Sequence, residues 1–135
     1  MNNFYSLRQD EYYIRRKAIS TDFEESYWGE VKDPDGETRC RINEREIFLE
    51  DTQYEIQYIN NLPPGKVIDI GCGLGFFLSG INSKWDKYGL EISNFASKHA
   101  SQWGTIHTSD FELFDFKKDY YDAIVLHHVI EHLKN

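Results

Sequence analysis

The chain reads Val67-Ile68-Asp69-Ile70-Gly71-Cys72-Gly73-Leu74-Gly75-Phe76-Phe77-Leu78 where an apolar, strand-like run meets three alternating glycines. Glycine lacks a Cβ, so it adopts turn conformations that other residues avoid and lets a ligand approach the backbone closely. A buried strand that ends in such a turn is typical of a cofactor site. We therefore predict a cofactor-binding turn at residues 71–75.

The spacing of these glycines distinguishes between cofactors. The dinucleotide fingerprint G-x-G-x-x-G needs its third glycine where the following helix packs against the strand, and Phe76 occupies that position here. The glycines stand instead at 71, 73 and 75, with Asp69 two positions before the first. In this pattern the chain resembles the class I S-adenosylmethionine-dependent methyltransferases, whose first motif reads D-x-G-x-G-x-G at the end of the first strand.

Three later stretches follow the order of motifs in the same family. They are Lys87-Tyr88-Gly89-Leu90-Glu91-Ile92-Ser93, Gly104-Thr105-Ile106-His107-Thr108-Ser109-Asp110-Phe111 and Tyr121-Asp122-Ala123-Ile124-Val125-Leu126-His127-His128-Val129-Ile130-Glu131-His132-Leu133. The first two read as strands that end in the carboxylates Glu91 and Asp110. The third is similar to the family's fourth strand and the turn after it.

The resemblance implies that the cofactor is S-adenosylmethionine and that S-adenosylhomocysteine is its product. It assigns Glu91 to the two ribose hydroxyls, a bidentate role that suits a carboxylate, and Asp110 to the adenine amino group. Asp69 would shape the turn and meet the ammonium group, and backbone N–H groups of the turn would receive the methionine carboxylate. The implied cofactor-binding set is Asp69, Gly71, Cys72, Gly73, Gly75, Glu91, Ile92, Asp110, Phe111 and His127.

Candidate catalytic residues lie at the end of the fourth strand. Methyl transfer from a sulfonium is an in-line displacement, so alignment and desolvation can supply much of the rate. His127, His128 and His132 are candidate general bases, because a histidine can take a proton at neutral pH. A structural role for these histidines, with the pair Glu131-His132 bracing the turn, stays open as the alternative.

Aromatic side chains in the first part of the chain suggest a cover for the site. Tyr12, Tyr13, Tyr27 and Trp28 could form a lid over a sulfonium, because aromatic faces attract cations. Ordinary packing is the alternative for each of them. The Tyr27-Trp28-Gly29 segment followed by a helix resembles methyltransferases that act on small molecules, including sugar and cell-envelope glycan precursors.

A metal site is the competing interpretation of the fourth motif. The stretch His128-Val129-Ile130-Glu131-His132 matches H-x-x-E-H, a zinc-peptidase signature. The strand pattern upstream accounts for the same residues without zinc, so we predict no metal. The two cysteines, Cys40 and Cys72, indicate neither a disulfide framework nor a metal cage.

Alternating strands and helices predict an α/β, Rossmann-like fold with a parallel sheet in strand order 3-2-1-4 and helices on both faces. Residues 63–135 would form the cofactor-binding core, and residues 1–62 an N-terminal helical or lid segment. Within the latter, Ile47, Tyr54, Tyr58 and Leu62 fall near one face of a helix over residues 42–62. Further helices are predicted at 76–81 and from a Ser93 N-cap to about residue 103.

The predicted core has fewer strands than the family it resembles. Class I methyltransferases have seven strands in the order 3-2-1-4-5-7-6, and this chain supplies the first four. Residues 123–126 would then form an apolar edge strand, which can pair with a strand of another chain. A homodimer through this edge is one expectation. Three functions stay open: a methyltransferase with a small-molecule acceptor, a truncated cofactor-binding fragment without turnover, and a non-catalytic interaction module.

Composition limits the partners. The chain of 135 residues holds 15 Lys and Arg against 23 Asp and Glu, a net charge of -8. An acidic chain repels phosphate backbones, so a nucleic-acid partner is not expected. Because no apolar run approaches the roughly 20 residues that cross a bilayer, and no signal pattern opens the chain, we predict no membrane insertion and a cytoplasmic location.

Overall fold

The computed structural model describes residues 25–32 and 34–130. Its elements, in chain order, are α1 (Glu25–Trp28), β1 (Glu30–Lys32), β2 (Thr38–Cys40), the 3-10 helix η1 (Arg41–Asn43), α2 (Arg45–Asp51), α3 (Gln53–Asn61), β3 (Lys66–Ile70), α4 (Phe76–Gly80), β4 (Asp86–Glu91), α5 (Asn94–Ala100), β5 (Thr105–Thr108), the 3-10 helix η2 (Phe111–Leu113) and β6 (Ala123–Leu126).

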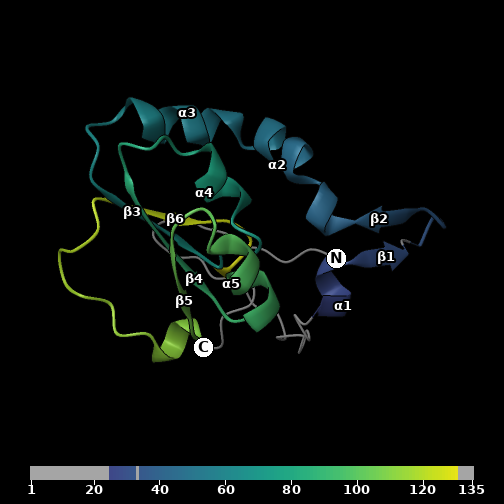
Figure 1. Cartoon of the computed structure of the whole chain (residues 1–135). Coiled ribbons are helices and arrows are strands. Elements are labelled where there is room, and N and C mark those ends of the chain that lie inside the picture. The colour runs from purple at the N-terminus through teal and green to yellow at the C-terminus, as the bar shows by residue number, and fades with distance from the viewer. Residues whose placement is uncertain (1–24, 33, 131–135) are drawn as a thin grey trace, which may run out of the picture.

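A parallel sheet of four strands in the order β5-β4-β3-β6 forms the centre of the molecule (Figure 1). Counted within the sheet, this is the predicted order 3-2-1-4; the labels differ because β1 and β2 form a separate antiparallel pair. Ile68 on β3 pairs with Tyr88 on one side and Ile124 on the other. Since all four strands run the same way, their carboxyl ends share one edge, where ligands bind in such sheets.

Strand β3 is buried on both faces, as expected of a central strand in a parallel sheet. Val67 and Ile68 point to opposite faces and are both fully buried. On the Val67 side, Ile56 and Ile59 of α3 and Phe77 of α4 complete one cluster. A neighbouring cluster packs Leu78 of α4 and Ala100 of α5 with Ile106 of β5.

The opposite face of the sheet is covered differently. Ile68, Ile70 and Leu90 pack there against aromatic side chains that come mainly from the connection between β5 and β6: Phe111, Phe114, Phe116 and Tyr121. Within the described residues, this connection contains only the short η2 and irregular backbone. The α-helices that the structure describes in the core therefore pack on one face, and a helix on the other face stays a prediction for residues outside those described.

The N-terminal segment contains a hairpin that the sequence did not predict. Strands β1 and β2 pair antiparallel, and the hairpin extends away from the four-stranded sheet (Figure 1). The turn at its tip contains Gly36, which has a φ of +94°. A strand of three residues is too short to show the alternation of apolar and polar residues by which strands are predicted from sequence. The boundary between residues 62 and 63 stays a prediction.

The predicted helix over 42–62 is two helices, α2 and α3, which meet at Thr52. Ile47, Tyr54 and Tyr58 are 62%, 76% and 68% exposed, while Ile56 and Ile59 enter the core. The predicted apolar stripe is therefore wrong at these three positions, while Leu62 does pack against the core. The buried face is the opposite side of both helices, where Leu49, Thr52, Ile56 and Ile59 follow one another at intervals of three or four residues. The Ser93 N-cap is confirmed, since its hydroxyl accepts from Ala96 N, but α5 ends at Ala100.

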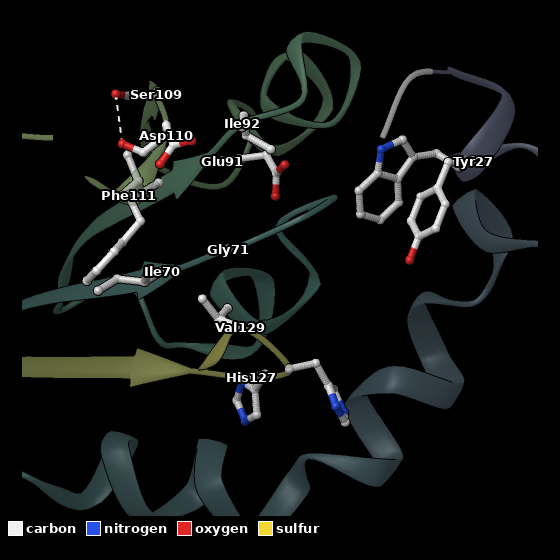
Figure 2. Close-up of a pocket in the computed structure, with 13 residues that line it drawn as sticks. Tyr27, Ile70, Gly71, Glu91, Ile92, Ser109, Asp110, Phe111, His127 and Val129 are labelled. Carbon is white, nitrogen blue, oxygen red and sulfur yellow. Dashed lines mark hydrogen bonds between the residues drawn. The ribbon is translucent and has the colours of Figure 1, made fainter. Parts of the chain in front are cut away.

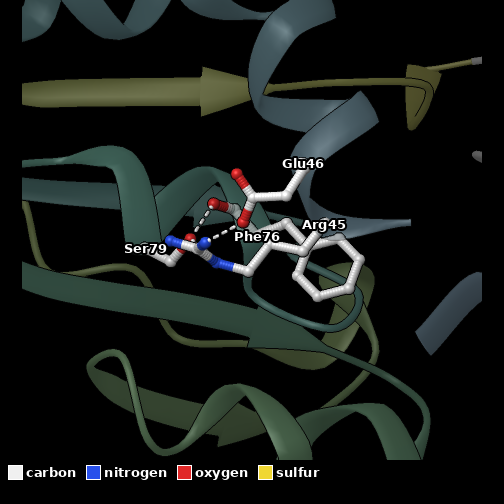
Figure 3. Close-up of polar contacts among 4 residues, drawn as sticks. All are labelled: Arg45, Glu46, Phe76 and Ser79. Atoms are coloured by element: carbon white, nitrogen blue, oxygen red, sulfur yellow. Dashed lines mark hydrogen bonds and ion pairs between the residues drawn. The ribbon is translucent and has the colours of Figure 1, made fainter. Parts of the chain in front are cut away.

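Arg45 connects α2 to the first helix of the core (Figure 3). Its Nε donates to Ser79 Oγ at 2.9 Å, and its Nη1 lies 2.6 Å from Glu46 Oε1. Ser79 in turn donates to the carbonyl of Phe76 at 2.6 Å, and the Arg45 guanidinium lies 5.2 Å from the Trp103 ring centre. These contacts hold the N-terminal segment against α4.

None of the described helices is long and apolar enough to cross a membrane.

Candidate functional site

A cavity of about 310 Å³ opens at the carboxyl ends of the strands (Figure 2). Its size lies at the lower end of the range for small-molecule sites, roughly 300–1,000 Å³. The ends of β3, β4 and β6, the segment after β5, and α1 all contribute. The lining residues are Tyr27, Trp28, Ile70, Gly71, Leu90, Glu91, Ile92, Ser109, Asp110, Phe111, His127, His128 and Val129.

The glycine turn has the conformation that its sequence demands. Gly71, Gly73 and Gly75 have φ angles of +71°, +52° and +81°, in the left-handed region that favours glycine. A Cβ at Gly71 would lie 2.5 Å from a methyl of Val129, and one at Gly73 would lie 3.0 Å from the Trp28 ring. The turn is therefore enclosed by neighbours from both ends of the chain.

Backbone N–H groups of the turn already have partners within the protein. Gly71 N and Cys72 N donate to the carbonyl of Leu90 at 2.7 and 3.1 Å. Gly73 N donates to Glu91 Oε2 at 2.8 Å. We expected N–H groups of the turn to bind the methionine carboxylate of the cofactor. These three N–H groups are instead bonded to β4 and attach the turn to that strand.

Glu91 is the polar centre of the site. Its side chain is buried, with 6% of the residue exposed. Besides Gly73 N, it accepts from Ser93 N through Oε1 at 2.8 Å. A carboxylate oxygen has two lone pairs, so each oxygen can accept a further hydrogen bond from the cavity side.

Asp69 lies beneath the turn and outside the cavity lining. It is 3% exposed, and its Oδ1 has no hydrogen-bond partner among the described residues. Burial raises the pKa of Asp69 to about 8, with the neighbouring charge of Glu91 adding to the effect. Burial also raises the pKa of the Cys72 thiol, so Cys72 is an inert, small packing residue.

Asp110 and Phe111 follow β5 and reach the cavity together. Asp110 Oδ1 accepts from Glu112 N at 2.8 Å and caps η2, while Ser109 Oγ donates to the Asp110 carbonyl at 3.1 Å. The Phe111 ring packs against Phe116, with centres 5.4 Å apart. The third strand is thus followed by a carboxylate, as predicted, and an aromatic ring lies beside it.

The two histidines after β6 differ in surroundings. The His127 ring lies 4.8 Å from Phe77 and 6.3 Å from Phe48, centre to centre, and points away from Glu91 (Figure 2). Burial lowers the pKa of His127, opposed by Glu55 and reinforced by His128. His128 lines the cavity with a φ of +55°, an uncommon conformation for a residue other than glycine. His132 lies outside the described residues.

Two of the four predicted lid aromatics stand at the site. Trp28 Nε1 donates to Ser93 Oγ at 3.3 Å. Tyr27 meets Trp28 edge to face at 4.9 Å, and the Arg41 guanidinium lies 4.0 Å above the Tyr27 ring. Tyr12 and Tyr13 lie outside the described residues.

The structure gathers most of the predicted cofactor residues. Gly71, Glu91, Ile92, Asp110, Phe111 and His127 line the cavity, whereas Asp69, Cys72, Gly73 and Gly75 form the turn behind it. The lining also includes Ile70, Leu90, Ser109 and Val129, which the sequence did not single out. Each of these four residues is adjacent in sequence to a predicted motif residue. Their place at a predicted strand end is therefore the signal that could have identified them.

Among the described residues, no group of three or more His, Cys, Asp or Glu side chains could hold a metal ion. Glu131 and His132 of the H-x-x-E-H match lie outside the described residues. The zinc interpretation is therefore not tested by this geometry.

Residues 43–135 match the family model described as methyltransferase domain. In fold, the chain is similar to magnesium protoporphyrin IX methyltransferase (ChlM) from Synechocystis PCC 6803. The structure with bound S-adenosylhomocysteine has 23% identity and a TM-score of 0.51, and the match covers 69% of this chain and 46% of the other. The structure with bound S-adenosylmethionine has the same identity and TM-score, covering 70% and 49%.

The plantazolicin methyltransferase BpumL, crystallised with S-adenosylhomocysteine, is a more distant match in fold. It has 25% identity and a TM-score of 0.46, covering 61% of this chain and 34% of the other. The chain thus spans less than half the length of these solved structures. No curated protein matches it in sequence.

Asp69→Asn should flatten the dependence of stability on pH. The unfolded chain releases this proton near the ordinary value of 3.8, while the folded chain holds it until about pH 8. Folding therefore takes up a proton in between, and the free energy of unfolding falls as pH rises through that window. Urea titrations across this range measure the slope.

The matched control is Asp51→Asn, which removes an exposed carboxylate at the end of α2. It should keep the wild-type slope. Equal slopes in wild type and Asp69→Asn would contradict a protonated Asp69.

Proposed function

Because the chain belongs to the methyltransferase-domain family of class I, S-adenosylmethionine-dependent enzymes, we propose that it transfers a methyl group from S-adenosylmethionine to a small-molecule acceptor. S-adenosylhomocysteine is then the product that leaves the cofactor site.

The charge of the cavity is the observation that carries this proposal. Two carboxylates, Glu91 and Asp110, line it together with aromatic rings, and the described lining contains neither Lys nor Arg. Such a site suits a cationic, nucleoside-like ligand and disfavours a phosphorylated one. A sulfonium beside aromatic faces and an adenosine held by carboxylates match this chemistry.

The buried acid beneath the turn also fits the cofactor. Asp69 leaves one oxygen without a partner close to the turn that would hold the methionine end. An ammonium group of the cofactor, reached directly or through water, is a partner of the right charge once Asp69 has released its proton. We assign Glu91 to the ribose hydroxyls, Asp110 to the adenine amino group and the backbone at His127 to the methionine end.

When bound, the cofactor supplies an electrophilic methyl group on a sulfonium. The protein's own part is to orient and desolvate, which suits an in-line displacement. Trp28 and Tyr27 cover the site from α1, and Glu91 fixes the orientation of the nucleoside end. Of the candidate bases, His127 and His128 both line the cavity, but the ring of His127 packs among aromatic side chains, so we assign the base to His128.

A hydroxyl on a sugar or glycan precursor is our proposed acceptor, on the strength of the Tyr27-Trp28-Gly29 segment. That segment now lies at the cavity, with Tyr27 and Trp28 in its wall. The cytoplasmic location stays a prediction from sequence.

Cofactor binding without turnover is the second candidate function. It is favoured by the edge of β6, which pairs only with β3 among the described strands. Ile124 and Leu126 are 57% and 39% exposed there. A sheet edge that is unpaired and apolar suggests that a working site needs a further strand from outside the described residues. A non-catalytic interaction module, the third possibility, would bind no cofactor.

We propose a second copy of this chain as the partner of that edge. Beside β6, a groove of about 480 Å³ runs between the strand and α3 and is lined by Tyr54, Tyr58, Ile124 and Leu126, among others. Tyr54 and Tyr58 are one helical turn apart and largely exposed. Two β6 strands paired about a two-fold axis would bring both groove walls together.

Glu91→Gln should weaken binding of S-adenosylhomocysteine about tenfold to a hundredfold, because a charge-assisted contact to the ribose is lost. Gln keeps one acceptor for the backbone of the turn. Titration calorimetry on wild type and variant gives the ratio. The control is Asp86→Asn, which also replaces a carboxylate by an amide but at the opposite end of β4. It should bind S-adenosylhomocysteine like wild type. Equal affinities for Glu91→Gln and wild type would refute the ribose assignment.

His128→Gln should lower methyl transfer to the preferred acceptor about 100-fold while S-adenosylhomocysteine affinity stays nearly constant, as for loss of a general base. The rate is read as S-adenosylhomocysteine formed with a panel of hydroxyl-bearing small molecules. His107→Gln on β5, outside the cavity lining, should keep the wild-type rate. An unchanged rate of methyl transfer in His128→Gln would show that His128 is not the general base. If the wild type binds S-adenosylhomocysteine but transfers no methyl group, the second candidate function is favoured.

Leu126→Lys should convert a dimer into a monomer, because it places a charge on the proposed interface strand. Light scattering coupled to size exclusion measures the mass. Leu113→Lys, at an 82% exposed position on η2, should leave the mass unchanged. A monomeric wild type would rule out the β6 dimer.

A further inference from the structure

We infer that Ser93 couples the N-terminal segment to the cofactor site, so that docking of Trp28 and binding of the cofactor strengthen each other. This inference rests on the proposed function. It makes Ser93 and Trp28 positioning residues for the nucleoside end of the site, acting through Glu91.

A closed ring of contacts joins the two regions. Trp28 Nε1 donates to Ser93 Oγ at 3.3 Å, and Ser93 N donates to Glu91 Oε1 at 2.8 Å. The second carboxylate oxygen accepts from Gly73 N at 2.8 Å. The ring closes because Trp28 lies directly over Gly73, where a Cβ would come within 3.0 Å of the indole.

Ser93 is the fixed point of this ring. It is 3% exposed, and its hydroxyl oxygen also accepts from Ala96 N at 3.2 Å as the N-cap of α5. Its carbonyl accepts from Ser97 Oγ, and Thr108 Oγ1 donates to Ser97 Oγ at 2.9 Å. Ser93 therefore belongs to the rigid core, and its contact with Trp28 attaches α1 to that core.

The position of α1 depends on such contacts. A helix of four residues is not stable alone, because nucleation is too costly for so short a segment. In the structure, Trp28 inserts between the glycine turn and Ser93, while Arg41 stacks on Tyr27 and holds it against Trp28. Loss of the Ser93 bond removes one side-chain hydrogen bond that ties Trp28 to the core.

Docking of Trp28 and binding of the cofactor affect each other because Trp28 and Glu91, two members of the ring of contacts, both lie at the cavity. Trp28 and Glu91 both line it, so a bound cofactor contacts the docked indole and the carboxylate that the docked segment helps to hold. A ligand that contacts the docked arrangement favours it, and docking must then favour the ligand by the same factor.

Trp28→Phe tests the inference with the indole N–H removed and an aromatic ring retained. We expect S-adenosylhomocysteine affinity to fall about threefold to tenfold, the range for one hydrogen bond. Ser93→Ala should lose at least this factor, because it also removes the N-cap of α5. The double variant should lose no more than Ser93→Ala alone, because the contact that Trp28→Phe breaks is then already gone. Titration calorimetry measures all four proteins.

Hydrogen exchange supplies a second readout. S-adenosylhomocysteine should slow exchange of the amides in 25–32 in wild type, and this protection should shrink in Trp28→Phe. A merely structural Trp28 would change stability and leave this ligand-dependent protection intact. The control is Trp103→Phe, which removes an indole N–H that has no partner among the described residues and lies outside the cavity lining.

The outcomes separate the inference from the proposed function. No binding of S-adenosylhomocysteine by wild type overturns both. Binding that is unchanged in Trp28→Phe, or losses that add in the double variant, overturns the coupling and leaves the cofactor assignment standing. Equal losses in Trp103→Phe and Trp28→Phe also overturn it.

Discussion

The carboxylate of Glu91 is the interaction on which the site depends. Its two oxygens accept from Gly73 N and Ser93 N, each at 2.8 Å, and so join the glycine turn after β3 to the start of α5. A buried carboxylate needs such partners, because an unpaired charge away from water is costly. One side chain therefore fixes the turn, the end of β4 and the cap of the next helix together, and the cavity takes its shape from that junction.

Burial separates the two acids near this junction into different roles. Glu91 is surrounded by donors and faces the cavity, whereas Asp69 lies beneath it with an oxygen that has no described partner. The desolvation that raises the pKa of Asp69 is the same exclusion of water that strengthens polar contacts at the turn. Two carboxyl groups at neighbouring strand ends thus differ because Glu91 has backbone donors on both oxygens, whereas Asp69 Oδ1 has no partner among the described residues.

The core of the fold follows from sequence because its signals are local. Strand β3, the glycine turn and the carboxylates Glu91 and Asp110 were predicted from motifs that each lie within a few residues, and all four strands occupy the expected order. The elements that sequence reasoning missed depend on distant contacts. The stripe through Ile47 and Tyr58 failed because Leu49, Ile56 and Ile59 also lie at helical spacing, on the opposite side, and only contact with the core decides which side is buried.

The aromatic connection between β5 and β6 has a consequence for how the chain folds. Strands β3, β4 and β5 follow one another through short helical connections, but β6 returns to β3 from far along the sequence: Lys66 N bonds Asp122 across 56 residues. Closing so long a loop costs more chain entropy than pairing sequential strands. During synthesis, therefore, one edge of β3 and the apolar face around Ile68 stay open to other chains until the last strand and its aromatic cover emerge.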